Sequence, residues 1–165
     1  MANRWKPHVT VAAVIEREGR FLLVEEQTAD GLCLNNPAGH LDPGESLEEG
    51  CIRETLEETA HSFRPTSLVG IYLSQVPQAA QHGLPSTCVT YLRFAFCGAL
   101  GSFFADRRLD HGIVRTLWMT PDEIRRSAGR HRSPVLVQCM EDYLAGVRYP
   151  LAVIHTDLRS LAAHR

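Results

Sequence analysis

Residues 39–61 read GHLDPGESLEEGCIRETLEETAH, a loop with glycines and a proline that leads into a helical pattern. Ser46, followed three positions later by Glu49, is a capping-box signal for the start of a helix. Apolar residues recur with helical spacing from Leu47 onward. The sequence therefore predicts a helix from about Leu47 to Thr59.

Three glutamates lie on one face of this predicted helix. Glu54, Glu57 and Glu58 are spaced i, i+3 and i+4, which places them within an arc of roughly 100°. Like charges this close repel each other, and a hard divalent cation such as Mg²⁺, or alternatively Mn²⁺, would offset the repulsion. Taken alone, such a trio is more often a solvated helix surface, so the surrounding residues have to decide between the two interpretations.

The residues that precede the trio have a diagnostic spacing. Gly39 is followed after five residues by Glu45, and Arg53 comes after seven more. With the glutamates, this matches the pattern G-x5-E-x7-R-E-U-x-E-E-x-G-U, where U is apolar, so the chain resembles the MutT-like Nudix hydrolases. Three positions depart from the pattern without changing a carboxylate: Thr55, Ala60 and His61. Alanine at position 60 stands where glycine would provide a left-handed helix cap.

The resemblance implies a site for Mg²⁺. Its implied ligands are three helix carboxylates and the backbone carbonyl of a loop glycine: Glu54, Glu57, Glu58 and Gly39. Arg53 is expected to hold either Glu54 or Glu45 by a bidentate bond. Glu45 is expected to support this pair or to reach a second metal ion through water. All five charged residues are thus expected to be catalytic.

The base that activates water is less defined by the resemblance. It is either Glu54 or a group from a later loop, and many relatives carry a glutamate where this chain has Gly112. Asp110 is the best substitute there. A turn residue beside a glycine is an equally good interpretation of Asp110.

The chain also resembles one phosphatase subgroup of the family over nearly its full length, through residues 5–11, 36–41, 132–134 and 148–151. That resemblance implies release of phosphate from nucleoside di- and triphosphates and from thiamine-pathway pyrophosphates (hydroxymethylpyrimidine pyrophosphate and thiamine pyrophosphate). The candidate substrate-binding residues are Trp5, Lys6, His8, Asp110 and Arg132. Alternatively, Trp5 and His8 pack at a sheet edge, and Arg132 belongs to a solvated basic cluster.

Three other functions compete with this one. An ADP-ribose-type nucleoside diphosphate pyrophosphatase is loosely suggested by Pro77 in the segment after the helix. A catalytically inactive Nudix-like binding module would be expected to have lost carboxylates that this chain keeps. An RNA 5′-end pyrophosphohydrolase would be expected to carry a basic groove with exposed aromatic residues, which a net charge of −2 disfavours.

Composition agrees with a small cytoplasmic enzyme. With 165 residues, 44% of them hydrophobic, the chain suits one domain over residues 1–165. The five scattered cysteines indicate neither a disulfide framework nor a zinc site. The N-terminus has no signal-peptide layout. We expect a small-molecule substrate, no nucleic-acid or membrane partner, and a monomer or small homo-oligomer.

Strand signals surround the helix. β-Branched and aromatic runs predict strands over residues 8–16, 20–26, 32–34, 68–75, 87–100 and 113–119. Residues 38–44 and 76–86 are expected to be loops. A short helix should begin at Thr120–Glu123, and a last one should cover about 134–145. This order predicts an α/β fold in which a mixed β-sheet packs between helices, an α/β/α sandwich.

Overall fold

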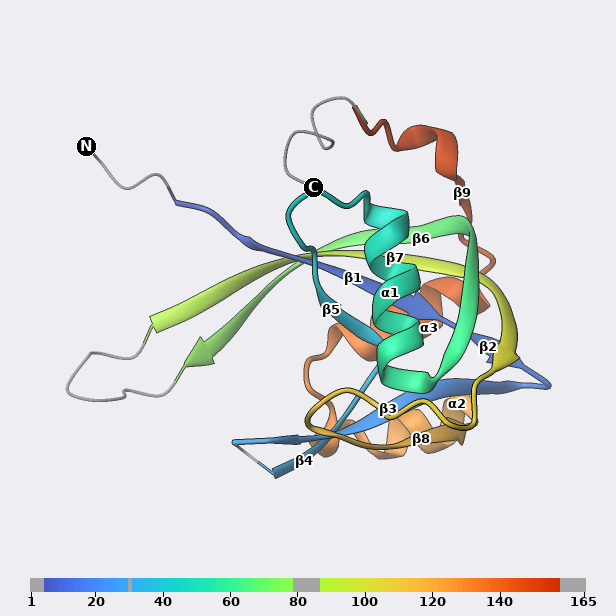
Figure 1. The fold of residues 1–165 in the computed structure, drawn as a ribbon. Helices are drawn as coiled ribbons and strands as arrows, with labels where there is room; N and C mark the ends of the chain where they lie inside the picture. Colours follow the sequence, from blue (N-terminus) through green and yellow to red (C-terminus); the bar gives the residue numbers. More distant parts are fainter. Residues whose placement is uncertain (1–4, 30, 79–86, 158–165) are drawn as a thin grey trace.

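A computed structural model describes residues 5–29, 31–78 and 87–157 (Figure 1). Its larger sheet has the order β5-β1-β7-β6-β9. Strand β1 runs parallel to β7, and the other neighbours in this sheet are antiparallel. The strands are β1 (His8–Val14), β5 (Ala38–His40), β6 (His61–Gln78), β7 (Thr87–Phe103) and β9 (Tyr149–Pro150).

A second, smaller sheet contains the remaining strands. Strand β3 pairs antiparallel with β2, β4 and β8. Their bounds are β2 (Glu16–Arg17), β3 (Arg20–Thr28), β4 (Gly31–Asn35) and β8 (Ile113–Met119). The expected α/β class with a mixed sheet and helices is confirmed, and the chain passes from the larger sheet to the smaller one between β1 and β2.

Helices cover both faces of the larger sheet (Figure 1). Helix α1 (Leu47–Thr59) packs on the face to which Val11 and Ala13 point, and α3 (Val135–Leu144) packs on the face of Ala12 and Val14. Alternate residues of β1 thus enter opposite cores, as the period of a strand requires. The shorter elements are α2 (Pro121–Arg126) and two 3₁₀ turns, Ala128–Arg130 and Leu151–Val153. None of the helices in the described ranges is long and apolar enough to span a membrane.

The ends of α1 are fixed by local hydrogen bonds. The Ser46 hydroxyl accepts from Glu49 N at 3.2 Å, and the Glu49 carboxylate accepts from Ser46 N at 2.8 Å. At the other end, Ala60 adopts the left-handed conformation with φ 56° and donates its N–H to Leu56 O. The chain therefore makes a left-handed cap with alanine where the family pattern has glycine.

Three predicted segments differ from the structure in their boundaries. Residues 38–40 form β5 within the expected loop, because this short segment pairs with β1. Strand β6 begins at His61 rather than at residue 68, and register shifts around Pro65 let the strand continue past the proline. The predicted loop over 76–86 begins inside β6, and its residues 79–86 lie outside the described part of the chain.

Candidate active site

Arg53 lies at the centre of the carboxylate cluster. Its Nε donates to Glu45 Oε2 at 2.9 Å, and its Nη2 donates to Glu45 Oε1 at 2.7 Å. Its Nη1 donates to Glu54 at 2.7 Å and to Glu57 at 3.1 Å. Of the two expected partners, Glu45 thus receives the bidentate bond and Glu54 a single one. A fifth bond, to the His40 carbonyl, ties the helix to β5.

Glu54 and Gly39 lie against each other. The Glu54 residue is only 8% exposed, and a Cβ atom built on Gly39 would lie 2.1 Å from its carboxylate. Any side chain at position 39 would therefore displace Glu54. Burial raises the pKa of Glu54, an effect that the hydrogen bond from Arg53 opposes.

Glu58 is a second buried carboxylate of the cluster. It is 8% exposed and accepts a hydrogen bond from Ala38 N in β5 at 2.8 Å. Burial raises the pKa of Glu58 to about 8, and the neighbouring charges of Glu54 and Asp110 add to the increase. The solvated-surface interpretation of the trio is thus wrong for Glu54 and Glu58, which point into the fold.

The structure brings Asp110 to the same place. Its backbone N–H donates to the Glu57 carbonyl at 2.9 Å, which holds the loop before β8 against the end of α1. Its charge contributes to the raised pKa values of Glu54 and Glu58. Asp110 therefore belongs to the carboxylate cluster even though it comes from a different element.

The donor set suits a hard divalent cation. Across the described ranges, no three acidic, histidine or cysteine side chains converge on one point as a finished metal cage, since Arg53 engages Glu54 and Glu57. The chemistry of the donors nevertheless fits Mg²⁺. Buried carboxylates whose pKa is raised by burial and by one another are stabilised in their ionised form by a cation with oxygen ligands.

The other predicted residues lie at different distances from the cluster. Trp5 is 66% exposed, and Lys6 is also exposed. The His8 ring lies 5.5 Å from that of His40 and 5.6 Å from that of Tyr91, at the end of the sheet.

Arg132 is half exposed and lies near Glu26 of β3. Its Nη1 lies 3.9 Å from Glu26 Oε2, and its backbone N–H donates to the Leu34 carbonyl. Of the four substrate candidates outside the cluster, it alone contacts a carboxylate that faces the cluster, since the charge of Glu26 acts on Glu58.

Two polar residues near Arg132 were not predicted. Arg93 enters the α3 side of the larger sheet and donates to Asn35 Oδ1 at 3.4 Å. Glu26 stands at the end of the apolar run of β3. One signal was available: Arg93 is the only charged residue in the strand sequence CVTYLRFAFCGAL, residues 88–100.

Known proteins resemble this chain over most of its length. The NUDIX domain family matches residues 6–138. Phosphatase NudJ of Shigella boydii serotype 4 (strain Sb227) is 37% identical over 151 residues, covering 91% of this chain and 92% of the relative. Phosphatase NudJ of Escherichia coli (strain K12) has the same identity and coverage.

Solved structures of Nudix hydrolases also resemble this chain. A NUDIX hydrolase from Nitrosomonas europaea is 51% identical with a TM-score of 0.82, covering 93% of this chain and 99% of that one. A MutT NUDIX hydrolase from Burkholderia pseudomallei shares the fold, with a TM-score of 0.63 at 20% identity, over 84% of this chain and 98% of that one. With the carboxylate cluster in the family's spacing, these matches show that the chain is an enzyme of the Nudix hydrolase family.

Proposed function

We propose that this protein is a Mg²⁺-dependent phosphatase that releases phosphate from nucleoside di- and triphosphates and from thiamine-pathway pyrophosphates. One observation carries the proposal: Glu54 and Glu58 are both 8% exposed and face β5, next to Gly39. Burying two like charges is costly unless a cation or ligand compensates them. The similarity to Phosphatase NudJ supports the substrate class.

The proposed Mg²⁺ ligands are Glu54, Glu57, Glu58 and the Gly39 carbonyl. When bound, Mg²⁺ supplies neutralisation of the diphosphate charge and a water of lowered pKa. Arg53 fixes the directions of Glu45, Glu54 and Glu57 by charge-assisted hydrogen bonds. Glu45 is itself held by Asp42 N at 2.7 Å, so we assign it a supporting role rather than contact with a second metal ion.

We assign acceptance of the water proton to Glu54. Its raised pKa brings a carboxylate closer to the range in which a general base is effective. Asp110 is the alternative, since it lies beside Glu54 and Glu58. Asp110→Asn separates the two, because it should keep most of the activity if Glu54 is the base and lose it if Asp110 is.

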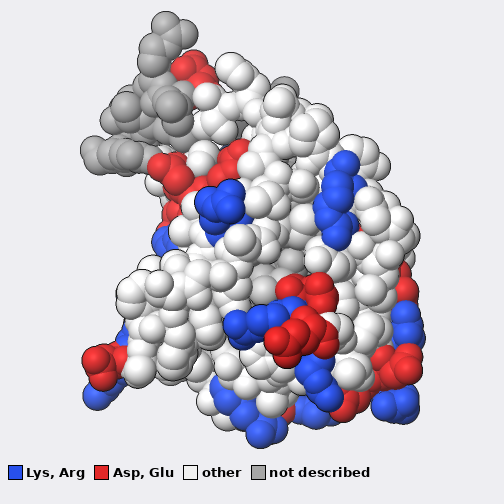
Figure 2. Space-filling model, turned by 90° about the vertical axis from the view of Figure 1, so that its right-hand side faces the viewer, with Lys and Arg blue, Asp and Glu red and all other residues white. Residues whose placement is uncertain are grey.

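The competing substrates are distinguished by products. A panel of nucleotides, thiamine pyrophosphates and ADP-ribose, assayed with Mg²⁺, should yield orthophosphate from the first two groups. Release of AMP from ADP-ribose as the main reaction would overturn the substrate class. Triphosphate-ended RNA should be a poor substrate, since the net charge of the chain is −2. On the face seen in Figure 2, basic and acidic side chains are interspersed.

The metal assignment is tested by Glu57→Gln. Glu57 lies at the open side of the cluster, with 34% of its side chain exposed, so the variant should fold and lose most of its Mg²⁺-dependent activity. Glu48→Gln, in the first turn of the same helix, is the matched control and should stay active. Full activity of a folded Glu57→Gln would show that the assigned ligand set is wrong.

A further inference from the structure

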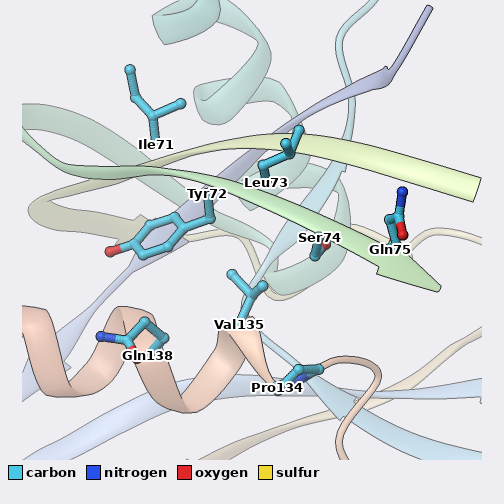
Figure 3. A pocket seen from close by; sticks show the side chains of 8 residues that line it. All are labelled: Ile71, Tyr72, Leu73, Ser74, Gln75, Pro134, Val135 and Gln138. Carbon is cyan, nitrogen blue, oxygen red and sulfur yellow. The ribbon is translucent and has the colours of Figure 1, made fainter.

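A groove runs between β6 and the start of α3 on the larger sheet. Figure 3 shows Tyr72 and Val135 facing each other across it, while Ile71 and Leu73 point to the opposite side of the strand. Pro134, two residues after Arg132, closes one end. The groove thus ends at the segment that carries Arg132.

Arg93 lies on the same face of the larger sheet as Tyr72, which lines this groove. Tyr72 is the direct cross-strand partner of Arg93 in the β6–β7 pair, and Thr10 is its partner in the β1–β7 pair, so the three side chains share one face of the sheet. Burial lowers the pKa of the Arg93 guanidinium. Its one side-chain hydrogen bond within the described residues is the long one, 3.4 Å, to Asn35.

Among the described residues, Thr10 beside Arg93 and Glu26 on β3 each carry a buried oxygen without a hydrogen-bond partner. In the described part of the chain, three buried side-chain oxygens make no hydrogen bond: Thr10 Oγ1, Glu26 Oε1 and Asn36 Oδ1. Thr10 is 6% exposed and lies beside Arg93 in the register. Unsatisfied buried acceptors are rare in folded proteins because each one costs free energy, so this cluster is suited to a ligand that brings donors.

Residues 35–38 connect Arg93 and Glu26 with the carboxylate cluster. Arg93 donates to Asn35, which lies two residues along β4 from Cys33, the cross-strand partner of Glu26, so Asn35 and Glu26 share one face of the smaller sheet. Ala38, three residues after Asn35, donates its N–H to Glu58. A pyrophosphate held at the cluster would therefore direct the rest of its molecule toward Arg93 and Glu26. A second phosphate is disfavoured there, because the Glu26 carboxylate, 3.9 Å from Arg132, would repel it.

We propose that Glu26 and Arg93 are specificity-determining residues that bind an amino-substituted nitrogen heterocycle on the substrate. The exocyclic amine donates to Glu26 Oε1, and the adjacent ring nitrogen or carbonyl accepts from Arg93. A carboxylate accepting from an amine beside an arginine donating to a ring acceptor is the pairing these side chains make with base edges. This inference rests on the proposed function, since it places the pyrophosphate of the same substrate at the carboxylate cluster.

The kinetic test compares two substrates that differ only at the edge of the ring that would face Glu26 and Arg93, in the group on C4 and in the proton on N3. CTP carries an amine where UTP carries a keto oxygen, so the wild type should prefer CTP in kcat/KM by on the order of tenfold. Glu26→Gln keeps the side-chain shape, and its amide can either accept from the amine or donate to the keto group. The preference should therefore fall toward unity, mainly through KM.

The control is Glu141→Gln. It removes one negative charge from α3, where Glu141 pairs with Arg125 at 2.7 Å, and it should keep the CTP preference. A wild type that hydrolyses both substrates equally well, or a Glu26→Gln variant with an unchanged preference, would overturn the assignment.

A binding measurement separates this inference from the proposed function. CMP and UMP, titrated against the wild type with Mg²⁺ and followed by ligand-observed NMR, should bind with the same preference as the triphosphates. Tighter binding of CMP with no phosphate release from any nucleotide would retain the specificity site and reject the proposed reaction. Phosphate release with no preference for CTP in hydrolysis or for CMP in binding would reject the specificity site and retain the proposed reaction. Arg93→Lys, checked for folding by urea unfolding, should weaken both nucleotides.

Discussion

At the scale of single residues, Arg53 is the position whose replacement should separate geometry from charge. Arg53→Lys keeps the positive charge but loses the planar fork that binds Glu45 through two nitrogens. Because the carboxylates lose their common anchor, Mg²⁺ affinity or kcat should fall by roughly 10- to 100-fold. Phosphate release measured over a Mg²⁺ titration gives both quantities.

A control for that substitution exists in the same chain. Arg125 also binds a carboxylate through two nitrogens, with Nε and Nη2 donating to Glu141 at 2.7 and 3.0 Å, and it lies on α2. Arg125→Lys should leave activity unchanged. Equal losses in the two variants would mean that Arg53 contributes only to general stability.

Glu58 makes metal binding depend on pH. Its pKa is raised to about 8 in the metal-free protein, whereas an unfolded chain ionises near 4.3. Stability of the metal-free protein should therefore fall as pH rises between these values, because only the unfolded state releases the proton. Binding of Mg²⁺ requires the ionised carboxylate, so affinity should increase by up to about tenfold per unit below pH 8.

Thermal melts at pH 6, 7 and 8, in a chelator and over a Mg²⁺ titration, measure both trends. Glu58→Gln cannot titrate and should flatten the two pH dependences. If Mg²⁺ affinity of the wild type were independent of pH across this range, Glu58 would not be the group that must ionise.

The sequence predicts the residues of the site unequally. Arg53 and the three helix glutamates are predicted from local sequence, because a helix places i, i+3 and i+4 together and because their spacing from Gly39 and Glu45 matches the family pattern. Glu26 and Arg93 could not be predicted as a pair. They meet through β-pairings between segments far apart in the chain, and such pairings depend on tertiary context rather than on local propensity.

At the scale of elements, local sequence likewise predicts the helix better than the strand pairings. Helix α1 begins and ends at its predicted residues because the signals for both ends are local. Strand β5 was not predicted, since a three-residue segment forms a strand only by pairing with β1. Local chemistry therefore fixes the helix that carries the carboxylates, while the sheet fixes what the carboxylates face.

The capping box of α1 provides a test at this scale. Ser46→Ala removes the hydroxyl that accepts from Glu49 N and should lower stability by about 1 kcal/mol, or roughly 2–4 °C in Tm for a chain of this length. Thr120→Ala removes the equivalent cap of α2 and should cost a similar amount. At 25 °C, where both variants remain folded, kcat should be unchanged in each. A large loss of kcat in Ser46→Ala alone would mean that the first turn positions Glu45 directly.

At the scale of the whole molecule, Glu25 connects three parts of the chain around the smaller sheet. It lies on β3 with 2% of the residue exposed, and it accepts from Arg115 of β8 at 2.6 Å and from Arg130 of the 3₁₀ turn. The hydrogen bond from Arg115 holds the pKa of Glu25 below its usual value. Glu25 thus links β8, which follows the Asp110 loop, to the segment that leads to Arg132.

Removing this charge should weaken the molecule in a pH-dependent way. Because the folded pKa is depressed, the stabilisation from Glu25 is complete above the ordinary glutamate pKa near 4.3 and is lost as pH falls through the folded value. Glu25→Gln should therefore lower the free energy of unfolding at pH 7 by roughly 1–2 kcal/mol. This loss is smaller than for a fully buried ion pair, because both arginines remain about half exposed. Urea unfolding of wild type and variant at pH 7 and pH 3 measures the difference, which should shrink at the lower pH. A difference of the same size at both values would mean that packing of the Glu25 side chain, and not its charge, stabilises the contact between the smaller sheet and the Arg132 segment.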